Sequence, residues 1–301
     1  MLRTFKTIMT RQKTQLQNPT LLRFAALSEF NELEKVVKAN KANKVGSMMI
    51  AALEHAKTEK ECERTKEIVM KAMERYNSKS EFHAIKLSAI GASFNESVAE
   101  RFACEIGERA KSLGTTVCLD AEEDELHLQE HEVSFKLMKQ LNRDLKESDA
   151  HACAYKTYQM YRVDMFDQLT KDLEVAKNNG FVLGVKMVRG AYLNIDAKKS
   201  NNVLFKKKEE TDESFAKGLE LVLKRENEPY CKIILATRNR ENIKSALGKN
   251  VQFAQLLGMD DDVTVELLER GERVAKYFPF GTFSETVPYL WRRTLERAAF
   301  S

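Results

Sequence analysis

Residues 184–193 join an apolar, strand-like stretch to a group that can bind an anion. The stretch runs directly into Arg189, which is followed by Gly190 and Ala191. Small residues let a ligand approach the backbone closely, and a guanidinium at a strand end can hold an anion or donate to a ring heteroatom. The same arginine could instead pair structurally with Asp120 or Glu122. Both roles are open from these residues.

A second candidate site lies in the last predicted helix, at 284–298. Side chains three and four residues apart share one helix face, and here they are Glu285, Tyr289, Arg292, Arg293 and Glu296. Two adjacent arginines beside a tyrosine and a glutamate form a fork suited to a carboxylate. A solvated face crossed by salt bridges is the alternative.

A third candidate begins at Asp120, which follows the apolar run 116–119 and is followed by Glu122 and Glu123. A carboxylate at a strand end can act as a base, a metal ligand or an anchor for a cation. Lys86, in an earlier apolar run, is a natural partner for it. A lysine in that place also permits a Schiff-base aldolase, and a solvated acidic loop is the structural alternative.

Two further patterns are weaker evidence for a functional site. Residues 127–131 match the H-x-x-E-H pattern of some zinc proteases, but only His151 could add a nearby ligand, so we predict no metal site. The basic run 198–208 follows the Arg189 strand closely. It is typical of a solvated loop, and it could also cover a phosphate-bearing cofactor.

The elements that position these residues alternate along the chain. Short apolar runs, typical of buried strands, are separated by stretches with apolar residues at three- and four-residue intervals, typical of amphipathic helices. The predicted strands are 47–51, 84–90, 116–120, 152–155, 182–188, 232–237, 251–257 and 274–278. The predicted helices include 61–76, 96–113, 133–146, 164–178, 209–225 and 263–270.

This alternation predicts an α/β fold with a closed (β/α)8 barrel, whose usual size is about 250 residues. A doubly wound open sheet is the competitor, but no G-x-G-x-x-G follows any strand. Barrel active sites form at the carboxyl ends of the strands. Polar side chains gather at those ends: Lys86, Asp120, Glu122, Glu123, Gln159, Arg189, Thr237, Arg238, Asn239, Gln255 and Tyr277.

Composition narrows the possible partners and compartments. The 301 residues carry a formal net charge of only +4, which argues against a nucleic-acid partner. No apolar run approaches the roughly 20 residues of a membrane-spanning helix. The five cysteines form no C-x-x-C pair, which favours a reducing compartment.

Residues 1–28 are basic and rich in threonine without an acidic residue, so they indicate a mitochondrial transit segment or a basic arm.

Taken in order, seven motifs make the chain resemble the proline dehydrogenase (proline oxidase) family over residues 44–297. The motifs lie at 84–90, 119–123, 157–159, 184–193, 253–259, 276–277 and 289–293. The resemblance implies a distorted (β/α)8 barrel at 44–301, preceded by a short helical arm at 1–43. It also implies non-covalent FAD and oxidation of L-proline to Δ1-pyrroline-5-carboxylate, with electrons passed to a quinone.

The resemblance further implies a role for each site residue. Arg292 and Arg293, with Lys86, would bind the proline carboxylate, and Glu296 would orient the polar groups around it. Leu256, Tyr277 and Tyr289 would wall the ring, and Asp120 would hold Lys86. Arg189 would lie by the flavin N5 and Gln159 by the isoalloxazine. The remaining FAD contacts would be Gly190, Ala191, Thr237, Arg238 and Asn239.

Two positions depart from the family pattern. Arg238 stands where the family usually has His, which puts cofactor affinity in question, although arginine can also meet a phosphate. Arg297 stands where the family has Asn. Neither change removes a substrate-binding residue, so we expect an active enzyme.

The resemblance also implies a place in the cell, the mitochondrial matrix with peripheral attachment to the inner membrane. The cytoplasm is expected instead if residues 1–28 are not a transit segment. Three rival functions stay open. These are hydroxyproline oxidation, a Schiff-base aldolase that uses Lys86, and a barrel without catalytic activity. The resemblance implies that Tyr277 disfavours hydroxyproline, because it would fill the space that the hydroxyl needs.

Overall fold

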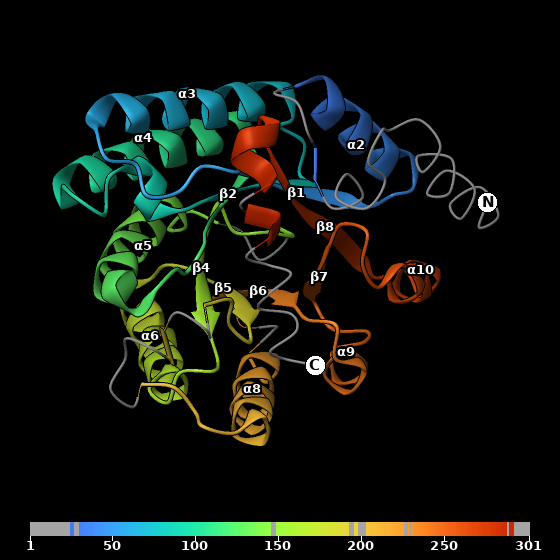
Figure 1. The fold of residues 1–301 in the computed structure, drawn as a ribbon. Coiled ribbons are helices and arrows are strands. Elements are labelled where there is room, and N and C mark those ends of the chain that lie inside the picture. The colour runs from blue at the N-terminus through green and yellow to red at the C-terminus, as the bar shows by residue number, and fades with distance from the viewer. Residues whose placement is uncertain are drawn as a thin grey trace.

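The computed structural model describes residues 25–26, 30–145, 149–192, 196–197, 203–225, 228, 230–287 and 289–291. Within them, parallel strands pair in chain order and β8 returns to β1, which closes the predicted barrel (Figure 1). The strands are β1 (Gly46–Ala51), β2 (Glu81–Ile85), β3 (Thr116–Leu119), β4 (Ala154–Gln159), β5 (Leu183–Val188), β6 (Cys231–Ala236), β7 (Val251–Leu256) and β8 (Arg273–Phe280).

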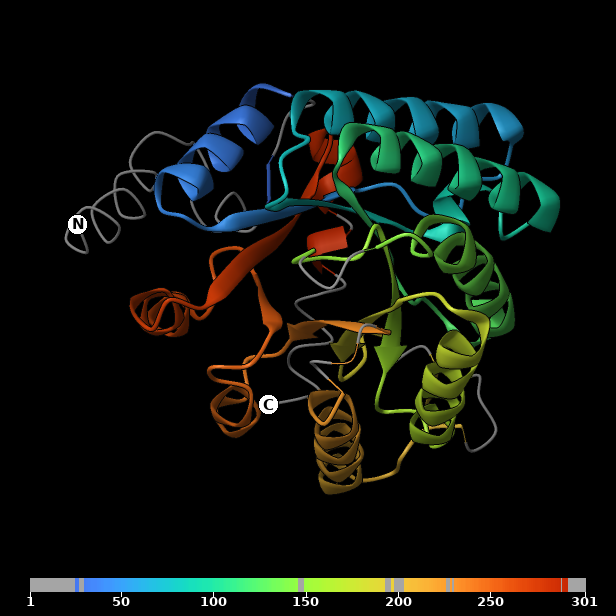
Figure 2. The same cartoon turned by 180° about the vertical axis from the view of Figure 1, so that it is seen from behind.

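Helices surround the barrel, as both views show (Figures 1 and 2). They are α2 (Asn31–Ala42), α3 (Glu59–Arg75), α4 (Glu96–Leu113), α5 (His127–Leu141), α6 (Met165–Asn179), α8 (Lys208–Leu223), α9 (Arg240–Ser245) and α10 (Asp261–Glu269). Local chemistry sets several ends: Thr58 caps α3 by accepting from Glu61 N, and Asn95 caps α4 by accepting from Val98 N. No helix of the described residues is long and apolar enough to cross a membrane.

Strand side chains alternate between two apolar layers. One layer fills the barrel interior and includes Met48, Phe82 and Tyr155, while the other packs between strands and helices. Gly184 belongs to the interior face of β5, and a Cβ on it would lie 2.1 Å from Ala154 O. Glycine is therefore required where β5 approaches β4.

Two strands differ from the predicted bounds by more than two residues at an end. The predicted second strand, 84–90, begins three residues after the start of β2 and extends five residues past its end, where Leu87–Ile90 is a 3-10 turn. The predicted fourth strand, 152–155, is too short, because β4 continues through Lys156, whose charge ended the apolar run. Lys156 is buried and pairs with Asp172 of α6 at 2.9 Å, so its charge is satisfied behind the strand. Sequence periodicity also missed α9, which has only 6 residues.

Candidate active site

The carboxyl ends of β2, β3 and β8 bring charged and phenolic side chains together. Tyr277 on β8 donates a 2.6 Å hydrogen bond to Asp120 Oδ2, just after β3. Lys186 on β5 reaches the other carboxylate oxygen, Asp120 Oδ1, as an ion pair. Its Nζ also lies 5.0 Å from the centre of the Tyr277 ring. We call Asp120, Lys186 and Tyr277 the interior triad. The carboxylate of Asp120 joins the other two side chains across the barrel interior.

Burial fixes the protonation of Tyr277. Removal from water, and then the negative charge of Asp120, hold the pKa of the phenol well above its usual range. The hydroxyl consequently stays protonated and can only donate toward the carboxylate. Tyr289 extends the group, because its hydroxyl donates to the Tyr277 oxygen at 3.5 Å.

Lys86 lies beside this group but has a different partner from the one predicted. It forms a buried ion pair with Glu54, in the loop after β1, rather than with Asp120. The prediction was wrong because β1 is the neighbour of β2 and its loop supplies Glu54, while Lys186 takes the Asp120 carboxylate. The Lys86 ammonium also lies 4.8 Å from the centre of the Tyr289 ring.

Sequence reasoning missed Glu54 and Lys186. Lys186 could have been found from the alternation of β5, since Leu183, Val185 and Met187 face the helices and Lys186 must face the interior. Glu54 carries no comparable signal, because it lies in an irregular loop.

Arg189 contacts the layer outside the barrel. Its guanidinium donates to Asp212 of α8 at 2.8 Å, to Thr237 after β6 at 2.8 Å and to Asn242 of α9 at 2.9 Å. It also lies 4.5 Å above the Phe215 ring. Neither of the structural partners considered from sequence is involved. The arginine instead joins β5 and β6 to the helices that follow them.

The loop after β5 has a shape that only glycine permits. Gly190 has φ 144°, and a Cβ there would lie 2.5 Å from the Tyr161 ring. Ala191 N donates to Gln159 Oε1 at 3.1 Å, and Gln159 Nε2 donates to Glu122 O at 2.8 Å. Gln159 thus holds the β5 loop against the segment after β3.

Two buried carboxyls support that segment. Glu122 accepts from Ser88 N at 2.9 Å and from Ser88 Oγ at 2.5 Å, while Glu130 accepts from Glu122 N at 2.7 Å. Burial raises the pKa of Glu122 to about 7 and holds that of Glu130 well above its usual range. Glu122 therefore ties the turn after Lys86 to the segment after Asp120.

Of the remaining predicted site residues, some belong to the part of the chain that the structure describes and others do not. Leu256, at the end of β7, leaves 41% of its surface exposed, and Arg238 is exposed. Asn239 caps α9 by accepting from Asn242 N at 3.0 Å. Arg292, Arg293, Glu296 and Arg297 lie outside the described residues, as do 1–24, most of the predicted transit segment.

The residues of the zinc-like pattern have separate partners. Glu130 binds Glu122 N, and His131 lies 2.6 Å from Lys156 Nζ. Across the described ranges, no group of three or more His, Cys, Asp and Glu side chains could hold a metal ion.

Similarity to known proteins adds an independent line of evidence. The chain matches the family described as Proline dehydrogenase over residues 33–301. It is 28% identical over 211 residues to human "Proline dehydrogenase 1, mitochondrial", covering 64% of this chain and 34% of that protein. It is 37% identical over 161 residues to "Hydroxyproline dehydrogenase" of Rattus norvegicus, covering 47% and 35%.

A bacterial relative covers more of the chain. The "Carbapenem antibiotics biosynthesis protein CarD" of Pectobacterium carotovorum is 30% identical over 226 residues, covering 72% of this chain and 57% of that protein. The chain thus spans about a third to just over half of these relatives' lengths. Among solved structures, proline utilization A from Bdellovibrio bacteriovorus has the same fold, with TM-score 0.78, 18% identity and coverage of 91% of this chain and 32% of that one.

Proposed function

The chain belongs to the proline dehydrogenase family, and from that premise we propose that it oxidises L-proline to Δ1-pyrroline-5-carboxylate with FAD, electrons passing on to a quinone. The observation that carries the proposal is the family match over residues 33–301. The geometry supports it, because two buried lysines and two tyrosines gather at the carboxyl ends of the strands. Cations beside aromatic walls suit a small amino acid with a carboxylate and an apolar ring.

The residues present fit a flavin ring. Thr157 follows Tyr155 on the interior face of β4 and pairs in register with Lys186. Its buried hydroxyl has no hydrogen-bond partner among the described residues. An unsatisfied buried hydroxyl is costly unless a ligand or water meets it, and a flavin ring offers nitrogen and oxygen atoms for it. Gly190 leaves the adjacent backbone without a side chain.

The bound FAD would supply the chemistry by accepting the hydride that leaves C5 of the proline ring. Lys86, with Arg292 and Arg293, would hold the carboxylate. Tyr277, Tyr289 and Leu256 would wall the ring, and Glu296 would orient the polar groups.

Asp120 would keep Tyr277 in place through the 2.6 Å hydrogen bond, and Lys186 would place a positive charge in the interior. On the cofactor side, the proposed contacts are Arg189, Gln159, Gly190, Ala191, Thr237, Arg238 and Asn239. The guanidinium of Arg189 is directed toward α8 and α9.

Hydroxyproline is the second candidate substrate. It is favoured by the relative named "Hydroxyproline dehydrogenase", which is 37% identical over 161 residues. Tyr277 would favour proline, because its phenol would occupy the side of the site where a ring hydroxyl needs space.

The proposed location is the mitochondrial matrix, at the inner membrane surface. It is supported by relatives named mitochondrial from Homo sapiens, Dictyostelium discoideum and Drosophila melanogaster and by the basic residues 1–28.

The visible spectrum of the protein reconstituted with FAD tests the function. We expect a flavin spectrum that proline bleaches without oxygen, and free FAD in the supernatant after acid denaturation. A protein that stays colourless after reconstitution contradicts the proposal. Borohydride trapping of a carbonyl substrate on Lys86 would then indicate the aldolase, and no trapping would indicate a barrel without catalytic activity.

A further inference from the structure

After β8, residues 283–287 are helical and so are residues 289–291, and we call these two described stretches together the terminal helix. It forms the red helical turns of Figure 1. Tyr289 on this helix packs with Tyr277, and its ring faces the Lys86 ammonium. The position of the terminal helix therefore sets the distance between one wall of the proposed substrate site and the other.

An ion pair from outside the barrel holds the start of this helix. Arg64 of α3 donates to Glu285 Oε1 at 2.7 Å, and Glu285 Oε2 accepts from Thr282 N at 2.9 Å. The Glu285 carboxylate thus caps its own helix and binds a neighbouring one. Burial acts to raise the pKa of Glu285, but the hydrogen bonds from Arg64 and Thr282 outweigh it and lower the pKa, so the pair is charged at neutral pH.

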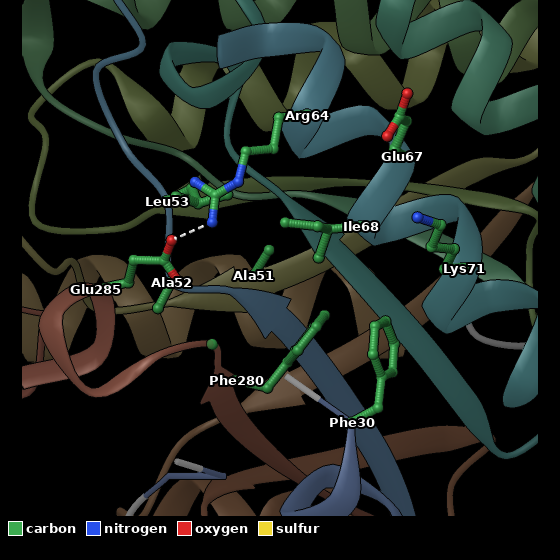
Figure 3. Close-up of a pocket in the computed structure, with 11 residues that line it drawn as sticks. Phe30, Ala51, Ala52, Leu53, Arg64, Glu67, Ile68, Lys71, Phe280 and Glu285 are labelled. Atoms are coloured by element: carbon green, nitrogen blue, oxygen red, sulfur yellow. Dashed lines mark hydrogen bonds and ion pairs between the residues drawn. The ribbon is translucent and has the colours of Figure 1, made fainter. Parts of the chain in front are cut away.

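A cavity of about 230 Å³ lies directly beside this ion pair. Ala51, Ala52, Ile68 and Phe280 line it, and Figure 3 shows the Arg64 side chain reaching past the cavity to Glu285. The cavity leaves unfilled space beside the start of the helix. The ion pair between Arg64 and Glu285 therefore adds a restraint on that side.

This restraint lies close to the substrate site along the chain. Glu285 and Tyr289 belong to two helical stretches and are only four residues apart in sequence. Gly281, at φ 149°, separates the helix from β8 and is a position where the backbone can turn. A shift at Glu285 would thus move Tyr289 relative to Lys86 and Tyr277.

We propose that Arg64 is a positioning residue: it acts through Glu285 to fix the terminal helix, and thereby the fit of the site around the substrate. The Arg64 side chain is 52% exposed and the Glu285 side chain 18% exposed, and an ion pair open to solvent contributes little to the free energy of unfolding. The inference rests on the proposed function only where it names proline.

The test compares Arg64→Met with a matched control, Arg109→Met. Arg109 forms an ion pair of the same 2.7 Å length with Glu74. The two arginines are similarly exposed, at 41% and 52%, while Glu74 is 50% exposed and Glu285 is 18% exposed. That pair joins α4 to α3 and does not touch the terminal helix. We expect Arg64→Met to raise KM for proline about 2- to 5-fold with kcat nearly unchanged, since an exposed pair is worth up to about 1 kcal/mol.

Two further variants separate charge from packing. Arg64→Lys retains the cation and should recover most of the affinity, and Glu285→Gln should resemble Arg64→Met while retaining the bond from Thr282 N. Arg109→Met should match the wild type. An Arg64→Met protein with wild-type KM, or an equal rise in Arg109→Met, would overturn the proposal.

A second measurement does not need activity. Trp291, the single tryptophan of the chain, lies on the terminal helix and is 62% exposed. Its fluorescence anisotropy should fall in Arg64→Met and not in Arg109→Met, in protein without substrate. If the chain does not oxidise proline, the kinetic measurement fails for every variant, including the wild type, while the Trp291 measurement still tests the restraint. Unchanged anisotropy in Arg64→Met contradicts the restraint itself.

Discussion

At the residue scale, one carboxylate of the interior triad binds two polar groups of the barrel interior. Asp120 neutralises Lys186 and also accepts from Tyr277. Charges inside a barrel are tolerated only when paired, because transfer of an isolated charge from water is very costly. The triad therefore keeps both a cation and a phenol in the interior without leaving either unpaired.

Tyr277 is expected to select between proline and hydroxyproline. Tyr277→Ser opens space on the ring side of the site, so the ratio of kcat/KM for hydroxyproline to that for proline should rise about 10- to 200-fold. Tyr277→Phe is the matched control, because it keeps the ring and removes only the hydroxyl, with its 2.6 Å bond to Asp120 and the 3.5 Å bond from Tyr289. It should leave the ratio nearly unchanged. A ratio that does not move in Tyr277→Ser would show that position 277 does not face the substrate.

Glu122 is expected to make stability depend on pH. Its pKa is about 7 in the folded protein and about 4.5 in an unfolded chain. The folded protein thus retains a proton that the unfolded chain releases, so this contribution is complete below about pH 4.5 and is lost as pH rises through about 7. Glu122→Gln, which carries no such proton, should show a smaller loss of unfolding free energy between pH 5 and 8.

The measurement is urea unfolding at both pH values, and the expected difference is on the order of 2 kcal/mol. Glu125→Gln serves as the control, because Glu125 is an exposed carboxyl in the same segment. An identical pH slope in wild type and Glu122→Gln would show that Glu122 is ionised in the folded protein.

At the element scale, side-chain hydrogen bonds help to position the starts of the strands, in addition to the packing of the two apolar layers. Asn142, fully buried at the end of α5, donates to Ala154 O at 2.8 Å and to Val182 O at 2.9 Å. It also accepts from Ala154 N at 2.9 Å. One side chain thus fixes the start of β4 relative to the start of β5, and so the depth at which Gln159 and Lys186 emerge.

Asn142→Ala should therefore destabilise the fold by about 3 kcal/mol, because it leaves several buried backbone groups unpaired. Asn179→Ala is the control, since Asn179 also ends a helix but makes a single exposed bond to Val175 O at 2.8 Å. It should change the unfolding free energy by less than about 0.5 kcal/mol. Chemical denaturation measures both, and equal effects would contradict the role of Asn142.

At the scale of the whole molecule, the packing of strands and helices buries most of the thiols. Cys62, Cys118 and Cys231 are buried, whereas Cys104 and Cys153 are partly accessible, and all are free. Burial raises the pKa of Cys118 and Cys231 to about 12, which suppresses the reactive thiolate.

A thiol-reactive dye should accordingly modify at most two cysteines quickly in the native protein and all five in denaturant. The counts are read from absorbance without added reductant. Three or more fast thiols in the native state would contradict the burial, and fewer than five in denaturant would reveal a disulfide.

The sequence alone determined the architecture, because strand and helix periodicities are local patterns. It predicted the alternation that builds the barrel, the approximate place of each strand and the residues at the strand ends. It did not place the end of β4, since Lys156 looked incompatible with a buried strand until Asp172 of α6 was seen beside it. Local pattern cannot show a partner supplied from a distant element.

Only the tertiary structure decided the pairings within the site. Asp120 and Lys186 are 66 residues apart in sequence, and Lys86 and Glu54 are 32 apart. Which cation meets which carboxylate depends on strand order around the closed barrel and on the inward or outward face of each position. The same alternation that points Lys186 into the barrel directs Arg189 toward α8. The sequence thus predicted most of the charged groups at the strand ends, while barrel closure determined which of them meet.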